Sequence, residues 1–75
     1  MEIKVFGQLK DILHHDNISI ESVNNVEELK KQLQYLFPDL SRKSFVVAVN
    51  RKVIHENILL QHDAEIALLP PFSGG

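Results

Sequence analysis

The carboxyl-terminal residues carry the most distinctive chemistry in the sequence. The chain ends EIALLPPFSGG, and Gly74 and Gly75 are two of only three glycines. At glycine's usual share of about 7%, two glycines at a given pair of positions occur by chance about 0.5% of the time. Because glycine has no Cβ atom, such a pair can enter a channel too narrow for other residues. The group that this tail would present is the α-carboxylate of Gly75.

A carboxylate is a poor electrophile, and it becomes reactive when it is activated, for example as an acyl-adenylate. The sequence contains no glycine-rich phosphate loop, no GxGxxG and no GKS or GKT motif. We therefore expect a partner enzyme to bind the ATP, and we expect this chain to bind no cofactor and to be non-catalytic alone. The alternative is an inert, frayed terminus, since chain ends are often disordered.

The residues before the glycine pair predict an exposed arm. Pro70 and Pro71 cannot donate hydrogen bonds to a sheet, so the last strand must end there. Two prolines also favour an extended segment, and residues 70–75 could reach about 20 Å as a flexible tail. Phe72 is a large apolar side chain on this arm, which predicts a contact with a partner. Ser73 could hydrogen-bond to a channel wall or could be tolerated only because it is small.

Length, charge and composition exclude several classes of function. A chain of 75 residues is expected to form a single domain, residues 1–75. Its net charge of −2 and the absence of a basic stripe argue against nucleic acid and against a polybasic membrane anchor. No apolar run is long enough to cross a membrane, and the start has no signal-peptide pattern. We expect a cytoplasmic protein.

The side chains that most often perform catalysis or bind metals form no recognisable motif. The chain has no cysteine, so it offers no thiolate nucleophile or thiolate ligand. Its four histidines lack the HExxH spacing and are expected to be ordinary surface residues. The acidic residues are scattered, and no carboxylate pair follows from their spacing. We predict no metal site and no self-contained active site.

Hydrophobic periodicity predicts the elements that position the tail. Period-two alternation indicates strands, and spacing of three and four residues indicates helices. The expected strands are 2–6, 17–22, 45–50, 52–54 and 65–70, and the expected helical segments are 7–15 and 24–40. The strand 45–50 is apolar on both faces and is expected to be central. In the loop 56–65, apolar residues should plug the core: Ile58, Leu59 and Leu60.

The main helix has a clear start and a clear stop. Asn25 suits the N-cap, and Glu28 stands three residues later, as in a capping box. Pro38 should end the helix. One apolar stripe is expected to face the core: Val26, Leu29, Leu33, Leu36 and Phe37. The order of elements predicts an α+β fold in which a mixed sheet of four to five strands packs on one main helix.

Two segments, FVVAVN and DAEIALLPPFSGG, resemble the MoaD/ThiS family of ubiquitin-like sulfur carriers. Within that family the small subunits of molybdopterin synthase look most similar. The segments IKVFGQLKDIL and NVEELKKQL are similar to the family's first strand and first long helix, so the resemblance covers almost the whole chain. It implies a β-grasp (ubiquitin-like) fold, in agreement with the predicted order of elements.

The resemblance also implies a mechanism and two partners. An adenylating enzyme related to ubiquitin activators would use ATP to form an acyl-adenylate at Gly75. Sulfur from a persulfide would then give a thiocarboxylate. The tail would enter the large subunit of molybdopterin synthase, in a heterotetramer, and supply sulfur to cyclic pyranopterin monophosphate for the molybdopterin dithiolene. Gly74 would keep the channel clear of side chains.

The family's partner surface lies on the sheet face away from the helix. By position, Phe6, Val53 and Leu69 match its apolar patch, with Pro70, Pro71, Phe72 and Ser73 continuing the contact. Phe72 stands where many relatives carry a smaller apolar residue, which bears on the shape of the partner's pocket. For Phe6, Val53 and Leu69 the alternative is plain core packing.

Three other functions remain open from the sequence. A thiamine-pathway sulfur carrier also ends in Gly-Gly, although its tail usually lacks the double proline. A ubiquitin-like protein modifier needs nearly the same tail. A β-grasp binding module with no terminal chemistry belongs to a different class. Adding one residue after Gly75 should abolish the function of a carrier but should leave a binding module unaffected.

Overall fold

The computed structural model describes residues 1–71, and the predicted sites at Phe72, Ser73, Gly74 and Gly75 lie outside the described residues. The order of elements agrees with the sequence prediction, with one addition, a 3-10 helix after the main helix. The elements are β1 (Glu2–Val5), α1 (Leu9–Leu13), β2 (Asn17–Ser19), α2 (Val26–Leu36), η1 (Pro38–Arg42), β3 (Val46–Val49), β4 (Lys52–Ile54) and β5 (Ile66–Leu69).

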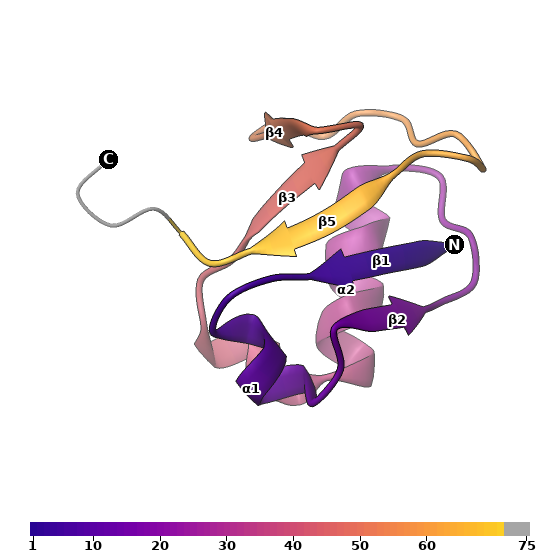
Figure 1. Cartoon of the computed structure of the whole chain (residues 1–75). Helices are drawn as coiled ribbons and strands as arrows, with labels where there is room; N and C mark the ends of the chain where they lie inside the picture. The colour runs from indigo at the N-terminus through magenta and orange to yellow at the C-terminus, as the bar shows by residue number, and fades with distance from the viewer. Residues whose placement is uncertain (72–75) are drawn as a thin grey trace.

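The five strands form one mixed sheet in the order β2-β1-β5-β3-β4, and α2 crosses one of its faces (Figure 1). β1 and β5 run parallel, and the other neighbouring strands are antiparallel. This arrangement confirms the predicted α+β architecture. The predicted central strand, residues 45–50, forms β3, which has a neighbour on each side. The middle position, however, belongs to β5. The strand that leads into the tail therefore has two strands on each side of it.

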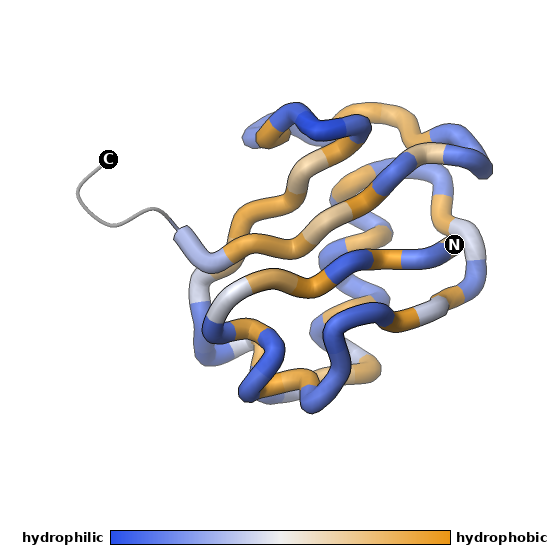
Figure 2. The backbone as a smooth tube through the Cα atoms, in the orientation of Figure 1, coloured by the Kyte–Doolittle hydropathy of each residue, from blue (hydrophilic) through white to orange (hydrophobic). Residues whose placement is uncertain are grey.

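Alternation of apolar and polar residues places the core between the sheet and α2. Figure 2 shows the hydropathy alternating along β1, where Ile3 and Val5 are buried and Glu2 and Lys4 are exposed. In β5 the buried residues are Ile66 and Leu68, and Val47 of β3 is fully buried beside them. Because successive strand side chains point to opposite faces, the intervening residues of β5 lie on the face away from α2.

The start of α2 is capped as predicted, with one difference. The side-chain oxygen of Asn25 accepts a hydrogen bond from the backbone N–H of Glu28 at 2.8 Å. The Glu28 carboxylate accepts from the N–H of Asn24 at 2.9 Å. In a standard capping box the carboxylate would bond the N–H of Asn25 itself. The cap therefore also holds the residue before the helix, in the connection that leads into it from β2.

Two predicted core positions are wrong. Leu36 is 44% exposed, because α2 ends at this residue and the chain then turns through η1. Leu40 of η1 is fully buried instead. Leu59 is 81% exposed, whereas Ile58 and Leu60 are half-buried. The carbonyl of Ile58 accepts from the N–H of Val26, and the N–H of Leu60 donates to the carbonyl of Asn24. This segment is thus extended beside α2, so Leu59 points away from the core.

Candidate functional site

The chain leaves the sheet at the end of β5. The N–H of Phe6 donates to the carbonyl of Leu68 at 3.0 Å, which continues the parallel ladder between β1 and β5. The next rung of such a ladder would take an N–H from residue 70, and proline has none. The predicted end of the strand at the double proline is therefore confirmed. Pro70 is half-buried and Pro71 is exposed.

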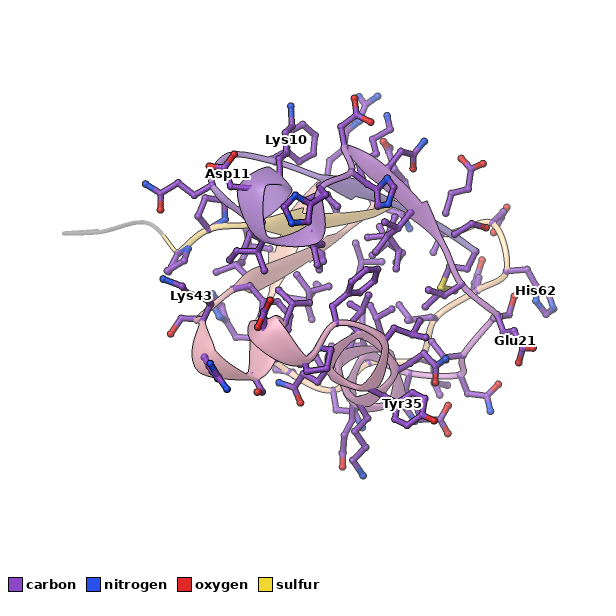
Figure 3. All side chains as sticks on the ribbon, turned by 90° about the horizontal axis from the view of Figure 1, so that it is seen from below. Lys10, Asp11, Glu21, Tyr35, Lys43 and His62 are labelled. Carbon is purple, nitrogen blue, oxygen red and sulfur yellow. The ribbon has the colours of Figure 1, made fainter. Side chains whose placement is uncertain are left out.

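A groove of about 450 Å³ borders this exit. Pro70 and Pro71 form part of its lining, together with Gln8, Leu9, Asp11, Ile12, Lys43 and Ser44. Figure 3 shows Asp11 and Lys43 at the end of the molecule where the chain leaves β5, with His62 and Glu21 at the opposite end. The two described residues of the arm therefore share this groove with residues of α1 and of the segment before β3.

A second hollow, of about 390 Å³, lies on the sheet face away from α2. Its lining includes Phe6, Val53 and Leu69, the three residues predicted for the partner surface. Ala48 is paired with Ala67 on one side and with Val53 on the other. Paired residues place their side chains on the same face of a sheet. The sheet thus brings the predicted residues together from three separate parts of the chain.

The exposure of these residues argues against simple core packing. Phe6 is 43% exposed and Val53 is 40% exposed, and Leu69 is half-buried. Side chains of this size that face solvent on one sheet surface form an apolar patch of the kind found at interfaces. The role of this patch, which we call the outer-face hollow, in binding a partner remains a prediction.

The small residues and the charged rim of the outer-face hollow were not among the predicted site residues. Ala48 and Ala67 line it, and Lys4, Arg51 and Glu65 stand around them. The two alanines could have been found from the order of residues in the strands, because Ala67 lies between Ile66 and Leu68, and Ala48 lies between Val47 and Val49, all four of which are buried. Lys4 could also have been found from the alternation in β1. Arg51 and Glu65 could not, because their position depends on how the turn after β3 folds back onto the start of β5.

The turn between β3 and β4 holds two of the rim residues, Arg51 and Glu65, in place. Asn50 and Arg51 have φ angles of 51° and 70°, as in a two-residue hairpin turn between β3 and β4. The side-chain oxygen of Asn50 accepts from the N–H of Glu65 at 2.9 Å, and the N–H of Asn50 donates to the carbonyl of Glu65 at 2.8 Å. Arg51 Nε lies 3.5 Å from Glu65 Oε1. Since both side chains are exposed, this ion pair contributes little to stability.

The described residues offer no other obvious centre for chemistry. Within residues 1–71, no group of three or more histidine, cysteine, aspartate or glutamate side chains could hold a metal ion. The four histidines, His14, His15, His55 and His62, are all exposed. In the same part of the chain, no helix has the length and apolar character needed to cross a bilayer. The expected cytoplasmic location stays a prediction.

Comparisons with known proteins point to one family. The ThiS family model matches residues 3–75. A protein of Dictyostelium discoideum named "Molybdopterin synthase sulfur carrier subunit" is 30% identical, and the match covers 99% of this chain and 94% of that protein. A protein of Arabidopsis thaliana with the same name is 28% identical over 100% of this chain and 84% of its own length.

Two solved structures are similar to this fold. SAMP1 from Haloferax volcanii has a TM-score of 0.78 at 23% identity, covering 99% of this chain and 97% of its own. At that identity it supports the fold alone. A complex of subunits 1 and 2 of the molybdopterin-converting factor from Helicobacter pylori contains a chain with a TM-score of 0.69 and 32% identity, covering 99% and 96%. These likenesses confirm the predicted β-grasp fold.

Proposed function

The chain belongs to the ThiS family of ubiquitin-like sulfur carriers, and we propose that within this family it is the sulfur carrier subunit of a molybdopterin synthase. The curated relatives that bear this name match almost the whole chain. The similar complex from Helicobacter pylori pairs two subunits of a molybdopterin-converting factor. By analogy, the partner of this chain would be the large subunit of the synthase, in a heterotetramer.

One geometric observation supports the proposal most strongly. β5 places Ala67 and Leu69 in the outer-face hollow and then runs directly into Pro70 and Pro71. A large subunit bound at the hollow would therefore lie beside the start of the tail. Binding at one surface and delivery of the terminus would be joined through a single strand. That arrangement suits a carrier better than a binding module in which the last residues are inert.

The proposed loading step uses the carboxylate of Gly75. One carboxylate oxygen attacks the α-phosphorus of ATP held by the adenylating enzyme, and pyrophosphate leaves. The terminal sulfur of a persulfide on the donor protein then bonds to the Gly75 carbonyl carbon, and AMP leaves. A second thiol then attacks the donor protein's sulfur in this acyl disulfide, so that a new disulfide forms with the donor and the thiocarboxylate leaves. Gly74 would let this end fit the narrow sites of both partners.

The proposed transfer step explains the character of the outer-face hollow. A dithiolene contains two sulfur atoms, so two thiocarboxylates must be used for each cyclic pyranopterin monophosphate. A carrier that has given up its sulfur must dissociate and be recharged. The apolar hollow is bordered by Lys4, Arg51 and Glu65, charges of both signs. Charged rims of this kind favour rapid and specific association more than very tight binding.

Intact-mass spectrometry tests the proposed loading. The chain would be coexpressed with its adenylating enzyme and sulfur donor, and the expected product gains the mass of one oxygen-to-sulfur replacement, located at Gly75. A chain extended by one alanine after Gly75 is the matched control, and it should gain nothing. Absence of the gain in the wild-type chain, or its location on an internal residue, would contradict the proposal.

A further inference from the structure

Gly7 lies so near Pro70 that a side chain at position 7 would meet the proline ring. It follows β1 with a φ angle of +62°, a left-handed conformation that L side chains rarely adopt. A Cβ atom built on Gly7 would lie 2.8 Å from Cγ and 3.1 Å from Cδ of Pro70. Carbon atoms pack best at about 3.5–4.0 Å, so a side chain at position 7 would displace the proline ring. Glycine is therefore required both by the backbone angle and by the neighbour.

This contact lies just beyond the last rung that the ladder can form. The N–H of Phe6 donates to the carbonyl of Leu68, and Pro70 has no N–H with which to continue the ladder. On the other side, the carbonyl of Gly7 accepts from the N–H of Lys10 at 3.1 Å, which anchors the turn into α1. Because the proline ring is part of the backbone, the place where it packs also fixes the course of the chain at residue 70.

We propose that Gly7 is a positioning residue for sulfur delivery. Its missing side chain lets the Pro70 ring pack against the turn between β1 and α1, and this packing sets the direction in which the chain leaves the sheet. The inference rests on the proposed function, since direction matters only if the terminus must enter a partner's site. Misplacement of a reacting group by about 1 Å can reduce a rate about 100-fold.

A double-mutant cycle separates this role from simple backbone strain. Four full-length chains are compared: wild type, Gly7→Ala, Pro70→Ala and the double variant. Each is prepared directly as its Gly75 thiocarboxylate by thiolysis of an intein fusion, so that the adenylating enzyme is not needed. The measured quantity is the rate of sulfur transfer to cyclic pyranopterin monophosphate at saturating large subunit.

We expect Gly7→Ala to lower the transfer rate about 10-fold in the wild-type background. In the Pro70→Ala background the same change should lower the rate less than about 3-fold, because the ring atoms that meet the new Cβ are gone. Equal losses in the two backgrounds would overturn the inference, since strain at a left-handed angle does not depend on Pro70. An unchanged rate in the single variant Gly7→Ala would also overturn it.

Two further measurements test whether a general loss of stability explains the lower transfer rate. Strain at position 7 should lower the Tm by roughly 4–8 °C in both backgrounds. Ile18→Val, in the edge strand β2, should lower the Tm by a similar amount but leave the transfer rate unchanged. A similar loss of rate in Ile18→Val would mean that stability alone explains the effect, which would overturn the inference.

Nuclear magnetic resonance keeps the inference testable if the proposed function is wrong. If the wild-type thiocarboxylate transfers no sulfur, the proposed function fails, but the packing of Pro70 on Gly7 can still be assessed. We expect Gly7→Ala to shift the signals of Leu69 and Pro71, and we expect these shifts to shrink in the Pro70→Ala background. Changes confined to residues 6–10 would overturn the positioning role.

Discussion

Ala48 of β3 and Ala67 of β5 lie directly opposite each other, and both line the outer-face hollow. Because neither side chain extends beyond Cβ, the larger Phe6, Val53 and Leu69 surround a depression instead of a flat surface. The depth of the proposed partner site therefore depends on two small residues in neighbouring strands. An apolar side chain of the large subunit could fill this space, in the manner of an interface anchor.

Filling the hollow should weaken binding of the large subunit. Ala67→Leu places a larger side chain on the outer face, where Ala67 is only half-buried, so the Tm should change little. The Kd for the large subunit, measured by calorimetry, should rise at least about 10-fold, which corresponds to about 1.4 kcal/mol. Ser19→Leu adds the same bulk in edge strand β2 and should leave the Kd unchanged. Equal effects of the two variants would contradict the assigned surface.

A charge in the outer-face hollow should also weaken binding of the large subunit, in this case through the cost of desolvation. Val53→Asp places a carboxylate that must lose water on binding, at an expected cost of about 2–4 kcal/mol of binding free energy. Leu59→Asp is the matched control, because Leu59, like Val53, is an exposed apolar residue but does not line the hollow. The assignment would be contradicted if Leu59→Asp weakened binding as much as Val53→Asp.

Two leucines of α2 should differ sharply in their contribution to stability. Leu33 is fully buried, and Leu33→Ala should lower the free energy of unfolding by about 2–5 kcal/mol. Leu36 is 44% exposed at the end of the helix, and Leu36→Ala should change it by less than about 1 kcal/mol. Urea denaturation of both variants measures the difference. Similar losses would mean that Leu36 packs in the core after all.

The turn between β3 and β4 contains backbone strain at Arg51, which a glycine at this position should relieve. Arg51 has a φ of 70°, so Arg51→Gly should raise the free energy of unfolding by about 0.5–1 kcal/mol, with glycine's greater freedom in the unfolded chain offsetting part of the gain. Asn50→Gly should not stabilise, because it removes the side-chain bond to the N–H of Glu65. Thermal unfolding compares the two, and a lower Tm for Arg51→Gly would refute the strain.

The sequence predicts the fold well where side chains alternate regularly. The pairs Ile3 with Val5 and Ile66 with Leu68 mark the inner face, and Asn25 marks the start of α2. The prediction fails where long-range hydrogen bonds decide the course of the chain. Leu59 points outward because its neighbours bond to the start of α2, and this pairing has no signature in the local sequence.

The site is only partly predictable, for a similar reason. The resemblance places Phe6, Val53 and Leu69 on one surface, and in the structure all three line the outer-face hollow. The proximity of Gly7 to Pro70 links two residues that are far apart in the sequence. A glycine after a strand indicates a turn, but the identity of its neighbour depends on the parallel pairing of β1 and β5.

The central claim is that this protein acts through the carboxylate of Gly75. The most direct measurement is sulfuration of cyclic pyranopterin monophosphate in a reconstituted mixture of the large subunit, the adenylating enzyme, ATP and a persulfide donor. A chain with a free terminus should yield molybdopterin, and the same chain amidated at Gly75 should yield none. Undiminished sulfuration with the amidated chain would contradict the claim.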